Sequence, residues 1–156
     1  MKTELILVGK TNDKHFQTGI DDYCQRIGHY MPFSITVIPE LKNTKSLGFQ
    51  QQKEREGELI LAKLQSSDHV VLLDEHGKDF RSVEFARWIE QKNASVRRLV
   101  FVIGGPYGFS ETVYSRANEK ISLSKMTFSH QMVRLVFVEQ IYRACTIIKG
   151  EPYHHE

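Results

Sequence analysis

Long apolar runs are missing from this sequence of 156 residues. No stretch approaches the roughly 18 apolar residues that a membrane-spanning helix requires, so we expect no membrane segment. The amino terminus, MKTELILVGKTND, has only a short apolar part and no small-residue cleavage site, so we expect no signal peptide. The length is typical of one domain, and we expect residues 1–156 to form a single domain.

Cysteine is scarce as well, and its two positions limit the chemistry. Cys24 and Cys145 lie far apart, each within a helix-like pattern, and no CxxC or Cys/His spacing is present. This arrangement argues against a zinc site, and we expect no metal. We predict that both thiols are reduced core residues of a cytoplasmic protein.

Three common motifs are absent too. The first apolar segment is followed by GKTNDK instead of GxGxxG, and no GxxxxGK[ST] phosphate loop occurs. These absences argue against a dinucleotide site and against a P-loop. The absence of GxSxG weakens a hydrolase interpretation.

Positive and negative side chains are nearly equal in number, so the net charge is only +2 and the pI is near 8.5. So small an excess does not by itself establish an RNA partner. The positive charges are nevertheless uneven: Lys42, Lys45, Lys53 and Arg55 share one polar segment, and Arg97 and Arg98 form a pair. A solvated surface explains both groups, and composition alone favours that interpretation over RNA binding.

What the sequence does contain is an alternation of strand-like and helix-like segments. It favours an α/β fold with a mostly parallel sheet flanked by helices, whose ligands bind at the carboxyl ends of the strands. Apolar runs predict strands within 1–9 and at 34–38, 70–74, 99–103 and 121–124. Helical periodicity predicts helices at 14–28, 53–65, from a cap at Ser82, and after Ser110 to about 119, with polar loops at 41–52 and 75–81.

The last helix-like segment, residues 131–149, has almost no polar face. A helix that is apolar nearly all round is buried on several sides. In a chain of this length the pattern predicts either an oligomer interface or a helix threaded through the core. Its apolar residues are Met132, Val133, Leu135, Val136, Phe137, Val138, Ile141, Tyr142, Ala144, Cys145, Ile147 and Ile148.

The run LVFVIGGPYGFS, Leu99 to Ser110, joins five apolar residues to a glycine-rich loop. Glycine lets a ligand lie against bare backbone, and proline stiffens the turn. Ser110 is placed to cap a following helix. At the end of a parallel strand such a loop predicts a small-molecule pocket, although a simple tight turn stays an alternative.

Several segments resemble the RlmH-type SPOUT RNA methyltransferases. The matching pieces are FVIGGPYGFS, ISLSKMTFSHQMVRLVFVEQIYRACTI and the tail PYHHE, together with the amino-terminal VGK and the MPF of Met31 to Phe33. The resemblance runs from end to end. These motifs in this order, in a chain of this length, are highly specific.

The resemblance implies a SPOUT α/β fold with a deep C-terminal trefoil knot, a rare exception to the usual absence of threaded chains. S-adenosyl-L-methionine is expected to sit bent inside the knot. Backbone groups would bind the adenine edge and apolar side chains its faces, although Leu73 alone would read as an ordinary core residue. By position, the cofactor-binding residues are Leu73, Gly104, Leu123, Ser124, Lys125, Met126, Thr127 and Phe128.

The resemblance also implies the reaction and the partners. Members of the family are homodimers that methylate ring nitrogen 3 of a pseudouridine in the helix 69 loop of 23S rRNA, in the assembled 70S ribosome. Methylation at nitrogen requires no covalent enzyme intermediate, and neither cysteine has the surroundings of a nucleophile. Because one copy has a small basic surface, we predict an active site composed of residues from both subunits.

Two side chains near the last helix are candidate catalytic residues. His130 follows the cofactor segment and could face the methyl group, although a helix-start histidine bonded to backbone fits the sequence equally well. Arg143 lies on an otherwise apolar helix and needs a partner, either Glu139 four residues earlier or an RNA phosphate. Arg134 is similar, with weaker support for a substrate role.

The tail, Pro152 to Glu156, would ordinarily be interpreted as a frayed terminus. The resemblance implies instead that Tyr153 and His154 act in catalysis by contacting the nucleotide. His155 stands where members commonly have arginine or lysine, which puts a phosphate-binding role for it in doubt. Two other functions stay open: a knotted methyltransferase that acts on tRNA, and a ribosome-binding module without catalysis.

Overall fold

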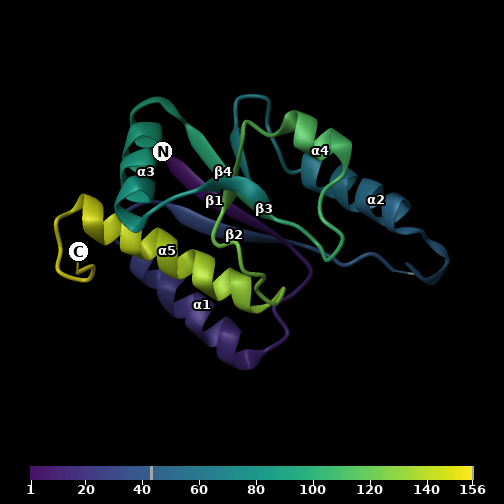
Figure 1. The fold of residues 1–156 in the computed structure, drawn as a ribbon, viewed down its shortest axis with the longest axis horizontal. Helices are drawn as coiled ribbons and strands as arrows, with labels where there is room; N and C mark the ends of the chain where they lie inside the picture. Colours follow the sequence, from purple (N-terminus) through teal and green to yellow (C-terminus); the bar gives the residue numbers. More distant parts are fainter. Residues whose placement is uncertain (43, 156) are drawn as a thin grey trace.

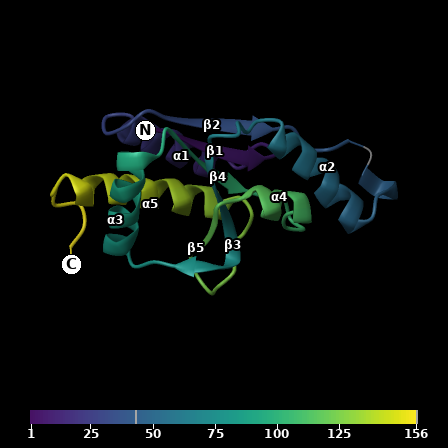
Figure 2. The same cartoon turned by 90° about the horizontal axis from the view of Figure 1, so that it is seen from above.

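The computed structural model describes residues 1–42 and 44–155, and in this part of the chain five parallel strands form one sheet. The strand order is β2-β1-β4-β3-β5 (Figures 1 and 2). The strands are β1 (Lys2–Val8), β2 (Phe33–Ile38), β3 (His69–Asp79), β4 (Arg98–Ile103) and β5 (Glu119–Ser122). The helices are α1 (Lys14–Ile27), α2 (Phe49–Leu61), α3 (Ser82–Ser95), α4 (Glu111–Arg116) and α5 (Met132–Ile148), with a short 3-10 turn at Thr44–Ser46.

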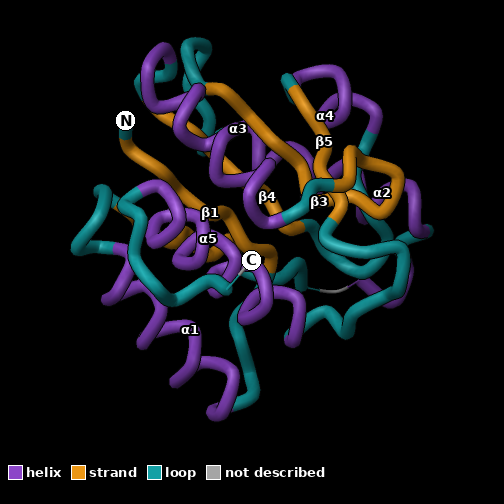
Figure 3. Tube along the Cα trace, turned by 60° about the vertical axis from the view of Figure 1, so that its left-hand side comes forward, coloured by secondary structure: helices purple, strands orange, loops and turns teal. Residues whose placement is uncertain are grey.

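Helices cover both faces of the sheet, as the alternation along β4 illustrates. Leu99, Phe101 and Ile103 pack into one core with side chains of α1, α3 and α5. Val100 and Val102 pack into a second core with side chains of α2 and α4. Figures 1 and 3 show α1 and α5 side by side, away from α2 and α4. The predicted α/β class, with a mostly parallel sheet flanked by helices, is confirmed.

The predicted loop at 75–81 is wrong, because β3 continues to Asp79. Leu73 pairs with Ile121, and after an irregularity Lys78 pairs with the same residue. The second pairing depends on Gly77, where a Cβ atom would lie 2.6 Å from the Ile121 backbone. The polar composition that indicated a loop belongs instead to a strand whose side chains are largely exposed.

Other boundaries shift for local reasons. The helix predicted from residue 53 begins at Phe49, inside the predicted loop at 41–52, since the exposed glutamines of its first turn hide the period. Ser82 is the first residue of α3 and not its cap; the Glu84 carboxylate accepts a hydrogen bond from the Arg81 backbone N–H instead, at 2.8 Å. The predicted cap at Ser110 is confirmed, with Oγ accepting from the Val113 N–H.

The first turn of α5 carries a fully buried arginine, Arg134. Its Nη2 donates to the Val8 carbonyl oxygen at 2.8 Å, and its Nη1 donates to the Gly9 carbonyl oxygen at 2.9 Å and to Thr11 Oγ1 at 3.0 Å. These contacts fasten the start of α5 to the carboxyl end of β1. Among the described helices, none is long and apolar enough to cross a membrane.

We predict that Arg134→Ala lowers the free energy of unfolding by about 3 kcal/mol, because it leaves buried carbonyl groups without donors. Urea denaturation followed by circular dichroism measures the loss. The matched control is Arg143→Ala on the same helix, whose partly exposed ion pair contributes less. Equal losses in the two variants would contradict the anchoring role of Arg134.

Candidate functional site

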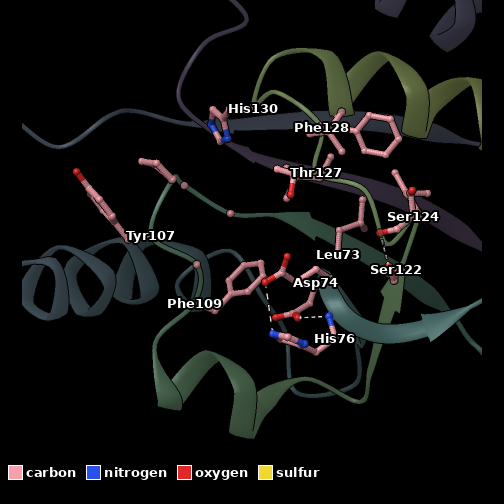
Figure 4. Close-up of a pocket in the computed structure, with 18 of the residues that line it drawn as sticks. Leu73, Asp74, His76, Tyr107, Phe109, Ser122, Ser124, Thr127, Phe128 and His130 are labelled. Carbon is pink, nitrogen blue, oxygen red and sulfur yellow. Dashed lines mark hydrogen bonds and ion pairs between the residues drawn. The ribbon is translucent and has the colours of Figure 1, made fainter.

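A cleft of about 680 Å³ opens at the carboxyl ends of β3, β4 and β5. This is the edge where a parallel sheet places its ligands, and the volume lies within the roughly 300–1,000 Å³ of small-molecule sites. Figure 4 shows Leu73, in β3, and Thr127, on the segment after β5, on two sides of the cleft. The lining consists of 73–76 after β3, the 103–109 loop after β4, and 122–124, 126–128, His130 and Val133 after β5, with Tyr114 from α4.

The glycines of the 103–109 loop are needed first for packing within the protein. A Cβ atom at Gly104 would lie 2.8 Å from the Phe109 ring, and one at Gly105 would lie 2.4 Å from a Glu56 carboxylate oxygen. Gly108 has a φ of +83°, a left-handed conformation that favours glycine. The tight-turn interpretation therefore holds alongside the pocket, since the loop is compact and also forms one wall of the cleft.

Most of the predicted cofactor-binding residues meet in this cleft. Lys125 does not line it and is exposed. Two hydrogen bonds hold the turn after β5: Ser122 Oγ donates to the Ser124 carbonyl oxygen at 3.0 Å, and the Met126 N–H donates to Ser124 Oγ at 2.9 Å. The predicted residues that line the cleft are Leu73, Gly104, Leu123, Ser124, Met126, Thr127 and Phe128.

Asp74 and Tyr114 also line the cleft but were not among the predicted site residues. Asp74 accepts hydrogen bonds from the Tyr114 hydroxyl and from the His76 backbone N–H at 2.8 Å. Burial and the bond to Asp74 raise the pKa of Tyr114 above its usual range. The position of Asp74 directly after Leu73 at a strand end was the available signal, whereas nothing in the sequence links Tyr114 to this edge.

His130 lies on the cleft wall. Its ring is in hydrogen-bond contact with Arg134. The distance from Arg134 Nη2 to His130 Nε2 is 3.2 Å. Because a guanidinium only donates, Nε2 is the acceptor, and the proton of the neutral ring is on Nδ1. Burial and the charge of Arg134 lower the pKa of His130, against a smaller opposing effect of a backbone hydrogen bond with Val8. In this arrangement the ring is neutral near pH 7, and its Nε2 is occupied by Arg134.

The other predicted catalytic residues, Arg143, Tyr153 and His154, form a second cluster with Glu139, and we call these four residues the tail cluster. Glu139 Oε1 accepts from Arg143 Nη2 at 2.6 Å and from the Tyr153 hydroxyl at 2.9 Å. Arg143 Nη1 lies 3.0 Å from His154 Nδ1, so the imidazole nitrogen accepts. The predicted pair of Arg143 with Glu139 is confirmed, and the tail packs against α5 up to His154.

The tail cluster and the cleft are at different ends of α5. The helix begins at Met132, close to His130, and its rise places Arg143 about 16 Å further along its axis. In Figure 1 the tail that follows α5 lies at the end of the helix opposite Met132. Within one chain, the structure thus brings His130 to the cofactor residues but leaves Arg143, Tyr153 and His154 apart from them.

The two cysteines and Arg98 have roles within the fold and not in the cleft. Burial raises the pKa of both cysteine thiols, Cys24 and Cys145, to about 11, so little nucleophilic thiolate is present near neutral pH. Arg98, one of the basic pair, binds the carboxylates of Glu4 and Asp68. Its charge is therefore neutralised within the fold.

We predict that His130 makes folding stability depend on pH. The unfolded chain binds a proton at His130 near pH 6.5, whereas the folded protein binds it only at lower pH. The stabilisation is therefore complete above pH 6.5 and is lost as the pH falls through the lowered pKa. Urea denaturation across this range should show a shallower loss for His130→Asn than for the wild type; parallel losses would contradict the assignment.

Comparison with known proteins adds the family. The family model described as "Predicted SPOUT methyltransferase" matches residues 1–154. Proteins named ribosomal RNA large subunit methyltransferase H are 67% identical in Bacteroides fragilis, 64% in Phocaeicola vulgatus and 57% in Flavobacterium johnsoniae. Each alignment covers 100% of both proteins. The resemblance inferred from the sequence motifs is confirmed, and the chain belongs to the SPOUT methyltransferase family.

Proposed function

We propose that this methyltransferase transfers a methyl group from S-adenosyl-L-methionine to ring nitrogen 3 of a pseudouridine in the helix 69 loop of 23S rRNA, within the 70S ribosome. The observation that carries the proposal is the cleft at the strand ends, lined by residues of the matching motifs, in a chain that aligns over its whole length with relatives named for large-subunit rRNA methylation. Ribosomes are in the cytoplasm, which we propose as the site of action.

The cleft suits this cofactor. Leu73, Ile103 and Phe128 offer apolar surface for the faces of adenine, and the compact loops after β4 and β5 offer backbone groups for its edge. Asp74, at the same edge, gives the cleft a carboxylate suited to the cationic parts of the ligand. When bound, S-adenosylmethionine supplies an electrophilic methyl group. Membership of the family also leads us to propose the knot through the segment that precedes α5.

The reaction requires the protein mainly to orient the cofactor and the nucleotide and to allow one proton to leave the ring nitrogen. After the ring nitrogen has lost its proton to solvent, it would take the methyl group in line as the methyl–sulfur bond breaks and the thioether leaves, and no bond to the enzyme is formed. The raised pKa values of both thiols, half-buried Cys24 and buried Cys145, are consistent with such a direct transfer. Because its Nε2 faces Arg134, we assign His130 the role of a positioning residue on the cleft wall, not of a general base.

We further propose that the active site is completed by a second copy of the chain. The tail cluster carries a guanidinium, a phenol and an imidazole that suit a nucleotide, yet in one chain it lies apart from the cleft. Met132 and Ile148, near the two ends of α5, each leave over a third of the side chain exposed. A two-fold axis that crosses α5 would bury this surface and bring the partner's tail cluster to the cleft.

Incubation of the purified protein with labelled S-adenosylmethionine tests the reaction. We expect methylation of helix 69 in 70S ribosomes that lack the modification, because the whole chain aligns with relatives named for this RNA. Bulk tRNA is the control substrate. Label in tRNA alone would replace our proposal with a tRNA methyltransferase, and calorimetry without cofactor binding would indicate a non-catalytic ribosome-binding module.

Mixing two inactive variants tests the composite site. Gly104→Val removes the cofactor wall, because its side chain would displace Phe109, and Arg143→Ala disrupts the tail cluster. If the site is shared, a heterodimer has one intact site, and remixed subunits should recover about a quarter of the wild-type rate. If each chain uses its own tail, the mixture stays inactive. Sedimentation of both variants as dimers is the control, and a wild-type monomer at micromolar concentration would contradict the proposal.

A further inference from the structure

Two aromatic side chains from distant parts of the chain stack on each other in solvent. Phe49 is the first residue of α2, and Tyr107 lies in the loop after β4. Their ring centroids are 4.2 Å apart, and the ring planes differ by 21°. Phe49 is 65% exposed, the largest fraction among the described aromatic residues, and Tyr107 is 41% exposed.

This stacked pair is not part of either hydrophobic core. Neither ring packs against the cluster beneath α2 and α4 or the cluster beneath α1, α3 and α5. Scattered exposed apolar residues need no explanation, but a contiguous exposed pair beside a cleft is typical of a binding surface. The packing of the fold therefore does not require these rings.

The pair lies at the rim of the proposed active site. Tyr107 is one of the residues that line the cleft, and Figure 4 shows it at the outer edge, on the side of His130. On the segment after β5, which lines the same cleft, Met126 is 81% exposed. A nucleotide that enters the cleft from solvent must pass this rim.

Two lysines near the pair suit the phosphates of a polyanion. Lys53 lies four residues after Phe49, on the same face of α2. Lys45 is exposed in the turn just before α2. A base stacked on the rings would have its backbone phosphates within reach of these cations.

We infer that the Phe49–Tyr107 pair is a stacking platform for an unpaired RNA base next to the nucleotide that is methylated. Single-stranded RNA is commonly held by aromatic rings on which bases stack, together with cations that follow the backbone. The inference rests on the proposed function, because it assigns the cleft to an RNA nucleotide. The platform holds the neighbouring base and leaves the cofactor pocket unobstructed.

Steady-state methylation of 70S ribosomes lacking the modification tests the platform. Phe49→Ala and Tyr107→Ala should each raise the KM for ribosomes about tenfold, the typical effect of losing one base stack. For Phe49→Ala, whose side chain lies outside the cleft lining, the kcat and the Kd for S-adenosylmethionine should stay near wild type. Phe49→Trp and Tyr107→Phe should preserve binding, since they keep a ring. Leu59→Ala, which removes another exposed apolar side chain of α2, is the matched control.

A second measurement reads stacking without catalysis. The probe is single-stranded RNA that contains 2-aminopurine, whose fluorescence is quenched on stacking. The wild type and Leu59→Ala should quench it, and Phe49→Ala should not. If the wild type fails to methylate ribosomes but this difference persists, the proposed function fails and the platform stands.

Three results would overturn the platform. The first is an unchanged ribosome KM together with unchanged quenching in Phe49→Ala. The second is a weaker Kd for S-adenosylmethionine in both alanine variants, which would make the rings part of the cofactor wall. The third is dissociation of the dimer in sedimentation of Phe49→Ala, which would assign the pair to a protein interface.

Discussion

The buried charge of Arg134 ties the end of β1 to the start of α5. Burying a guanidinium is unfavourable unless its N–H groups are bonded, and the carbonyl oxygens of Val8 and Gly9 supply acceptors at the end of β1. The two terminal nitrogens reach these acceptors only when the first turn of α5 lies against that strand end, while the buried Nε has no partner among the described residues. The segment between β5 and α5 is thus fixed at both ends, by pairing with β3 at one and by Arg134 at the other. This segment forms one wall of the cleft.

The opposite wall is fixed by packing. The loop after β4 turns tightly because Gly104 and Gly105 let Phe109 and Glu56 approach its backbone, and Phe109 belongs to the core beneath α2 and α4. One wall therefore depends on a buried charge and the other on a hydrophobic core. A cleft with two independently held walls is preorganised for a ligand, which lowers the ordering cost of binding.

The sequence predicted those parts of the structure that depend on local pattern. Apolar runs such as 99–103 located the strands. Of the eight residues that the motifs predicted for the cofactor, seven line the cleft. The sequence did not predict features that depend on contacts between residues far apart in the chain. The polar run at 75–81 is strand because Gly77 admits the Ile121 backbone, and Arg134 is a structural anchor because its acceptors lie more than a hundred residues earlier. Neither relation leaves a periodic trace.

The separation of the tail cluster from the cleft has a physical consequence for the reaction. Tyr153 and His154 are bonded to Glu139 and Arg143 of α5, so a tail that swung over to the cleft of its own chain would break these contacts. A second copy placed across α5 removes that cost, because its tail cluster arrives already formed. Assembly of the dimer, and not rearrangement of the tail, would then complete the site. In that case α5 is apolar nearly all round because it packs on the sheet, on α1 and on α3, and its remaining surface packs on its symmetry mate.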